Sequence, residues 1–201
     1  LVGSEMCIRD SSYIELVNKY IPDMKKYVST TGSPMYYAAR IAKKKHPDAK
    51  IVFVGPCVAK RKEAQRDEAV DFVMTFEEIS SIFDAMEVNL EIVQPYAMEF
   101  SSVREAHGFA QAGGVMGAVK AFLKMEADKI NAVQVSDLNK KNIAALRAYA
   151  KTGKAPGQFI EVMACEGGCI TGPSTHSGSK SGKWQLSQEL TKQTKTYENM
   201  E

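Results

Sequence analysis

The stretch GQFIEVMACEGGCITGPS, residues 157–174, joins a predicted strand to a loop that carries two cysteines. Its first part is rich in apolar and β-branched residues, which predicts a strand. Cys165 and Cys169 follow, so their thiols share one face if the segment turns helically. Gly167 and Gly168 permit positive φ and let the backbone approach a bulky ligand closely. Backbone N–H groups of such a loop are expected to donate to the sulfides of a cluster.

Upstream of this stretch, predicted strands alternate with predicted helices, which is typical of an α/β domain with a largely parallel sheet and flanking helices. The strands are expected at 49–55, 71–75, 90–93, 131–137 and 157–164, the first of them as a buried strand. The helices are expected at 11–28 with an interruption at Pro22, and at 33–46, 75–87, 113–126 and 138–153.

Three helix ends carry specific signals. Ser33 is expected to cap a helix that has Pro34 at its first position. Thr75 with Glu78 three residues later forms a capping-box pattern, and Gly153 marks the end of a helix.

Cysteines occur directly after two of the predicted strands. Cys57 follows the strand at 49–55, and Cys165 follows the strand at 157–164. In open α/β sheets, ligands gather at the carboxyl ends of the strands. We therefore expect a metal or cluster site at this edge of the sheet.

The composition limits the class of protein. The chain has 201 residues, 44% of them hydrophobic, and a net charge of +2 with charges of both signs interspersed. One domain is expected, and neither nucleic acid nor an anionic membrane is expected as the main partner. No apolar run is long enough to span a bilayer, and no secretory signal is recognisable. Few cysteines in such a context indicate a reducing, cytoplasmic location.

The two ends of the chain are set apart from the expected domain. LVGSEMCIRDS, residues 1–11, resembles translated sequencing-adapter read-through, so it is treated as non-native, and no role is expected for Cys7. The domain is expected over 12–173. Residues 174–201 are expected to form a polar, flexible tail, in which Lys180, Lys183, Lys192 and Lys195 face solvent and 172–183 lacks regular structure.

Spacing alone leaves several roles open for the remaining cysteines. Cys57 taken alone fits a small buried apolar residue. The Cys165–Cys169 pair fits a redox dithiol, a zinc site or an iron–sulfur site. A zinc site needs a further ligand, for which the chain offers His46, His107 and His176 at unconvincing spacing.

Two segments together resemble a known family. VGPCVAKRKEAQRDE, residues 54–68, and EVMACEGGCITGPS, residues 161–174, resemble two of the three signature segments of the iron-only (FeFe) hydrogenase catalytic domain. The connecting segments YIPDMKKYVSTTGSP, residues 20–34, and FAQAGGVMGA, residues 109–118, resemble the family as well. The resemblance runs from about Ser12 to about Pro173.

The resemblance implies a cofactor in two parts, the H-cluster. A 4Fe-4S cluster is held by four cysteines, one of which bridges to a two-iron unit with CO, cyanide and a bridging dithiolate. The implied reaction is 2 H+ + 2 e- = H2. Cys57, Cys165 and Cys169 resemble three of the four cluster ligands, and Cys169 resembles the bridging one.

The resemblance also implies roles for residues around the two-iron unit. Ser33, Pro34 and Lys60 resemble the groups that hold the cyanides, and Pro56 belongs to the cofactor-binding segment before Cys57. The pocket is implied to be lined by Phe109, Gly113, Gly114 and Met163. Catalytic roles are implied for Ser29, on the proton path, for Lys60 and for Cys169, while Glu63 resembles a structural acid.

The implied partners are H2 and protons, a ferredoxin or neighbouring Fe–S domain that exchanges electrons, and the cluster maturation machinery. Neither nucleic acid nor a membrane span is implied.

The sequence departs from the family pattern in several places. The first signature segment, with the fourth cluster ligand and a proton-relay cysteine, is expected directly before Tyr13, where the chain reads CIRDSS. We therefore expect a truncated catalytic domain that alone neither makes nor oxidises hydrogen. Gly55, Met35 and the ending at 168–174 differ from prototypical enzymes and resemble sensory or otherwise divergent members more closely. Two classes of function remain: a hydrogenase of prototypical or hydrogen-sensing kind, and a non-catalytic hydrogenase-like protein of iron–sulfur assembly.

Overall fold

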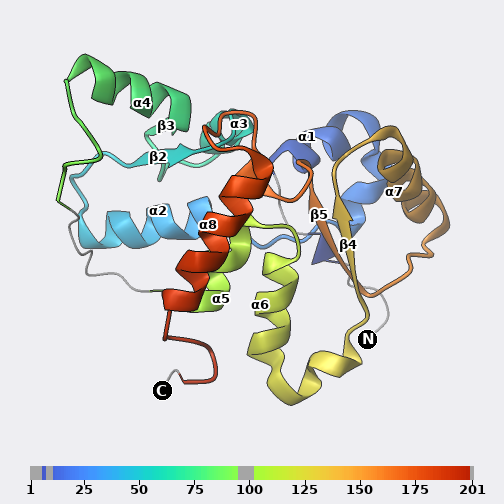
Figure 1. Ribbon diagram of the computed structural model, residues 1–201. Coiled ribbons are helices and arrows are strands. Elements are labelled where there is room, and N and C mark those ends of the chain that lie inside the picture. The colour runs from blue at the N-terminus through green and yellow to red at the C-terminus, as the bar shows by residue number, and fades with distance from the viewer. Residues whose placement is uncertain (1–5, 8–10, 95–101, 200–201) are drawn as a thin grey trace.

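The strands form two small, separate parallel sheets in the computed structural model, which describes residues 6–7, 11–94 and 102–199 (Figure 1). One sheet has the strand order β1-β5-β4, and the other pairs β2 with β3. All pairings are parallel. The predicted α/β class with parallel strands and flanking helices is confirmed, although the strands are divided between two sheets.

In chain order the elements are β1 (Met6–Cys7), α1 (Ser11–Tyr20), η1 (Pro22–Tyr27), α2 (Pro34–Lys45), β2 (Val52–Gly55), α3 (Ala59–Ala64), β3 (Phe72–Thr75), α4 (Phe76–Ala85), α5 (Arg104–His107), η2 (Gly108–Ala110), α6 (Gly114–Leu123), η3 (Lys124–Lys129), β4 (Ala132–Ser136), α7 (Lys140–Thr152), β5 (Phe159–Met163), η4 (Cys169–Thr171) and α8 (Ser179–Lys192).

Strand β5 is the structural centre, because every one of its residues is buried. Its apolar side chains Ile160 and Val162 share a core with Tyr13 and Val17 of α1 and with Leu146 of α7. This core fixes the strand that leads directly into the two-cysteine loop. A second, smaller core lies between α2 and one face of the β2–β3 sheet.

The three predicted helix-end signals are confirmed. The Ser33 side chain accepts a hydrogen bond from the Tyr36 N–H, and Pro34 begins α2. Thr75 and Glu78 form the reciprocal capping box of α4. Gly153 adopts the left-handed conformation, with φ of 67°, after the last turn of α7. These ends fix where α2, α4 and α7 begin or stop.

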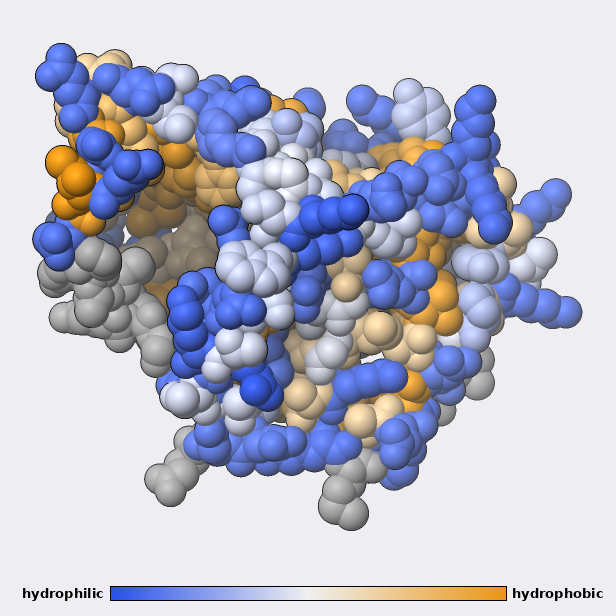
Figure 2. All heavy atoms as spheres, in the orientation of Figure 1, coloured by the Kyte–Doolittle hydropathy of each residue, from blue (hydrophilic) through white to orange (hydrophobic). Residues whose placement is uncertain are grey.

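One predicted strand is absent, and another is present but less buried than predicted. Residues 90–93 form turns and a bend instead of a strand. The strand β2 exists but is not fully buried, since Val52 and Val54 keep 45% and 38% of their surface exposed. Only the opposite face of the β2–β3 sheet, with Phe53 and Val73, packs against the smaller core. Figure 2 shows apolar surface at the upper left, near α4.

Helix α8 corrects the expectation for the C-terminal segment. It forms within 174–201, and its first residues lie in the part of 172–183 that was expected to lack regular structure. The flexibility of this segment stays a prediction. Of the set-aside residues 1–11, Met6–Cys7 form a short strand beside β5 and Ser11 begins α1, while 1–5 and 8–10 lie outside the described residues. Among the described residues, no helix is long and apolar enough to cross a membrane.

Candidate functional site

The two cysteine-bearing loops begin at carboxyl ends of strands and contact each other. Cys57 lies two residues after β2, and Cys165 lies two residues after β5, as predicted. The Ser174 N–H donates to the Pro56 carbonyl at 3.2 Å. A Cβ placed on Gly172 would lie 2.7 Å from that same carbonyl oxygen, so glycine allows this close approach.

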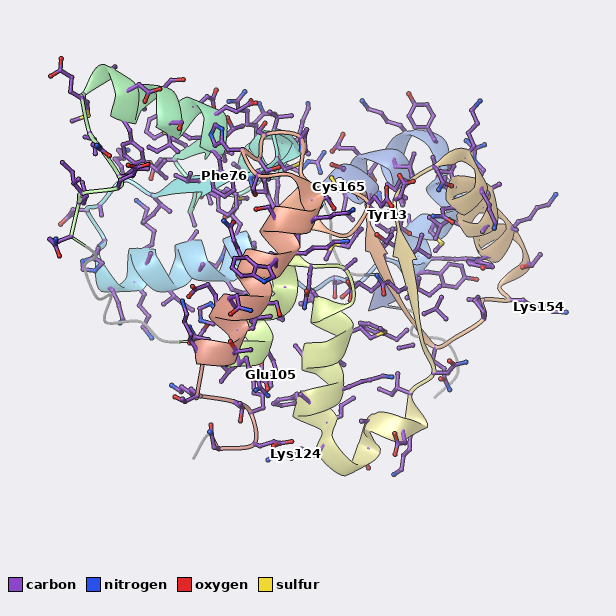
Figure 3. All side chains as sticks on the ribbon, in the orientation of Figure 1. Tyr13, Phe76, Glu105, Lys124, Lys154 and Cys165 are labelled. Atoms are coloured by element: carbon purple, nitrogen blue, oxygen red, sulfur yellow. The ribbon has the colours of Figure 1, made fainter. Side chains whose placement is uncertain are left out.

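A third segment, the turn before α6, packs against the cysteine loop. The Ala112 N–H donates to the Gly167 carbonyl at 3.0 Å. Gly168 has a φ of 104°, and a Cβ there would lie 2.5 Å from the Ala112 nitrogen. Figure 3 shows Cys165 at this junction, near the N-terminal end of α8. The segments that carry Cys57, Cys165 and Phe109 therefore converge, as the resemblance implied.

The loop from Cys165 to Gly172 is held by its own hydrogen bonds. The Ser136 hydroxyl, at the end of β4, accepts from the Gly167 N–H at 2.8 Å and donates to the Cys165 carbonyl at 3.4 Å. The N–H groups of Gly168, Thr171 and Gly172 donate to carbonyls within the loop. These N–H groups are thus used inside the protein, which differs from the expectation that they point at sulfides.

The carboxylate of Glu63 gathers the polar side chains near Cys57. Lys60 donates to it at 2.7 Å, and the hydroxyls of Ser33 and Ser11 donate to it as well. Ser12 lies beside this group, with its Oγ 3.9 Å from the Cys57 Sγ. Burial raises the pKa of Glu63, but the charge and hydrogen bond of Lys60 and the two hydroxyls outweigh it, so the net pKa lies below its ordinary value.

Replacement of Glu63 by glutamine is expected to destabilise the protein in a pH-dependent way. Because the folded pKa is lowered, the carboxylate stabilises the fold above the ordinary value of 4.5, and this contribution disappears as the pH falls through the folded pKa. Urea unfolding at pH 7 should show a loss of about 1–2 kcal/mol in Glu63→Gln, since bonds to a charged acceptor are lost. The loss of unfolding free energy in Glu63→Gln should become smaller below pH 4. The control is Glu126→Gln, which changes an exposed acid that pairs with Lys129. A loss that stays constant with pH would contradict this account.

Glu161 is a site residue that the sequence analysis missed. It is fully buried in the middle of β5, and its two carboxylate oxygens accept from the N–H groups of Gly113 at 2.6 Å and Met116 at 2.7 Å. Burial raises the pKa of this carboxyl above its ordinary value, because its effect outweighs that of the two N–H donors, which act in the opposite direction. Glu161 thereby ties the start of α6 to the strand that precedes Cys165. A single acid between Ile160 and Val162 in an apolar strand was the signal for it.

The other predicted residues are distributed around this centre. Met163 is buried as the last residue of β5, and Phe109 is half-buried in η2. Gly113 and Gly114 line a hollow between α6 and α8. Ser29 lies in a separate hollow with Val28 and Thr30, so the described contacts do not bring it to the cysteines. The site roles of all of these residues stay predictions.

The donor set suits an iron–sulfur cluster. Among the described residues, no three His, Cys, Asp or Glu side chains gather closely enough to hold one ion. A four-iron cluster needs no such grouping, because each thiolate binds a different iron. Three half-buried thiols on converging loops, with glycines where the backbones meet, suit a bulky, soft-ligand cofactor.

Comparisons with known proteins agree with this geometry. A family model described as "Iron only hydrogenase large subunit, C-terminal domain" matches residues 11–173. The "Cytosolic Fe-S cluster assembly factor narfl" of Danio rerio is 28% identical, and the match covers 73% of this chain and 47% of that protein. "Iron hydrogenase 1" of Clostridium pasteurianum is 25% identical, and the match covers 80% of this chain and 36% of that protein. The chain thus spans less than half of either relative.

Solved structures share the fold. An FeFe-hydrogenase studied for oxygen inactivation superposes with a TM-score of 0.67 at 22% identity, over 96% of this chain and 67% of that one. A variant of the FeFe-hydrogenase HydA1 from Chlamydomonas reinhardtii gives a TM-score of 0.66 at 20% identity, over 93% of this chain and 65% of that one.

Proposed function

Because this chain belongs to the family formed by the C-terminal domain of the large subunit of iron-only hydrogenases, we propose that it binds a 4Fe-4S cluster through Cys57, Cys165 and Cys169. The observation that carries the proposal is the contact between the loops of Cys57 and Cys169, where the Ser174 N–H meets the Pro56 carbonyl. Both loops follow strands in parallel sheets, so their positions depend on the packed cores. Residues 12–173 would form the catalytic-domain part, with 174–201 following it.

We further propose that the chain is part of a hydrogenase, with a two-iron unit joined to the cluster at Cys169. Such a unit supplies the reversible reduction of protons to dihydrogen. The chain's own residues would bind and orient it: Ser33 and Lys60 would donate to its anionic ligands, and Phe109 and Met163 would exclude water. Lys60 is suited to this role because Glu63 holds its ammonium group in place at 2.7 Å.

The segments that bind the two-iron unit would also include Pro34, Pro56, Gly113 and Gly114. Ser29 would pass a proton. Electrons would come from a ferredoxin or a neighbouring Fe–S domain, in a reducing cytoplasmic environment.

A non-catalytic role in iron–sulfur assembly is the second candidate. It is favoured by the 28% identity to the assembly factor narfl. Both candidates need a cluster at the cysteines, but only the hydrogenase needs donors for cyanide. A hydrogen-sensing protein would share the two-iron unit with the hydrogenase. The presence of the two-iron unit therefore separates both of these from the assembly protein.

Infrared spectroscopy of the cluster-loaded chain after treatment with hydrogenase maturation proteins tests the hydrogenase proposal. We expect bands in the CO and cyanide stretching regions. Lys60→Met should shift or broaden the cyanide bands because a cyanide donor is lost, whereas Lys62→Met, an exposed neighbour on α3, should leave them unchanged. A loaded cluster without any such bands would sink the hydrogenase proposal and favour the assembly role.

A further inference from the structure

Helix α8 places a lysine side chain on the loop between the two proposed cluster ligands. The helix contacts η4, the short turn that begins at Cys169. A Cβ on Gly182 would lie 3.4 Å from the Ile170 carbonyl, so the first turn of α8 lies against this turn. This packing directs the next residue, Lys183, toward Gly167.

Gly167 leaves the room that the lysine occupies. A Cβ placed on Gly167 would lie 2.6 Å from the Lys183 Nζ and 2.7 Å from its Cε. Gly167 also has a φ of 82°, a conformation that side chains rarely adopt. The ammonium group therefore rests directly on the backbone midway between Cys165 and Cys169.

Within residues 6–7, 11–94 and 102–199, Lys183 has no ion-pair partner. Among the described residues, Lys60 pairs with Glu63 and Lys192 pairs with Glu189, whereas no carboxylate lies within ion-pair distance of Lys183. The positive charge is thus available to act on whatever the two cysteines hold. Since Lys183 is exposed, its effect should be moderate and should weaken with salt.

We propose that Lys183 tunes the reduction potential of the cluster held by Cys165 and Cys169, an inference that rests on the proposed function. Uptake of an electron makes the cluster more negative. A nearby ammonium group stabilises this reduced state and raises the midpoint potential. Lys183 would act through its charge alone and would not bind iron.

A redox titration of the reconstituted 201-residue chain with dithionite, followed by EPR, tests the proposal. At the wild-type midpoint potential, Lys183→Met should raise the ratio of oxidised to reduced cluster about fivefold, which is a shift of about 40 mV to more negative values for one electron. Lys183→Arg keeps the charge and should titrate like the wild type. The shift in Lys183→Met should diminish as the ionic strength rises, which a merely structural role would not produce.

Lys192→Met is the matched control, because Lys192 lies about 13 Å further along the same helix. If the cluster loads in all variants and Lys183→Met titrates within twofold of the wild type, the charge role is overturned while the proposed function stands. If the wild-type chain takes up no cluster, the proposed function fails and the charge role fails with it.

Discussion

Cys169→Ser is expected to lower the iron and sulfide content of the anaerobically reconstituted chain at least about tenfold. The proposed cluster depends on three thiolates, and a serine hydroxyl is a harder and far less acidic ligand that does not replace a thiolate. The loop itself should remain folded, because it is held by Ser136 and by its own backbone hydrogen bonds. Iron and acid-labile sulfide assays on equal amounts of folded protein measure the effect.

Cys7→Ser is the control for this experiment. Cys7 lies in the segment that the sequence analysis sets aside, so its replacement should leave the cluster content unchanged. Equal loading of Cys169→Ser and wild type would contradict the proposed ligand set. A loss of cluster in Cys7→Ser would instead show that the set-aside segment contributes a ligand.

Glu161→Gln is expected to cost about 1–3 kcal/mol of unfolding free energy, because one of the two buried N–H donors that the carboxylate accepts from loses its acceptor. Glutamine keeps one acceptor oxygen but turns an NH2 group toward the other N–H. Urea unfolding followed by circular dichroism should show a lower midpoint with an unchanged slope. The hydrogen bonds affected are those that the Glu161 carboxylate accepts from the N–H groups of Gly113 at 2.6 Å and Met116 at 2.7 Å.

The control for this prediction is Glu189→Gln, which changes an exposed acid of α8 that pairs with Lys192. Its effect should stay within about 0.5 kcal/mol, as for most surface substitutions. If Glu161→Gln is as stable as this control, the carboxylate does not hold α6 against β5 as described.

Local signals in the sequence were sufficient for much of the fold. The caps at Ser33, Thr75 and Gly153 act through neighbours in sequence, so residue identity alone predicted them. The error at 90–93 arose because the four residues LEIV are too few for their pattern to distinguish a strand from an irregular turn. The exposure of Val52 depends on what packs against the sheet, which the residue pattern of β2 does not contain.

The candidate site was predictable in part. Cysteines after strands, read together with the family resemblance, led to the converging loops around Cys57 and Cys165. Contacts between distant segments were not predictable from the pattern. The Glu161 carboxylate reaches a helix 45 residues away, and the Lys183 side chain reaches Gly167 from a helix that the polar sequence of the C-terminal segment did not predict.

The most direct test of the central claim is the metal and sulfide content of the wild-type chain after anaerobic incubation with iron, zinc and sulfide. The account predicts about four irons and about four sulfides per chain, with an EPR signal after reduction by dithionite. Stoichiometric zinc without sulfide, or a metal-free chain with a Cys165–Cys169 disulfide, would contradict it.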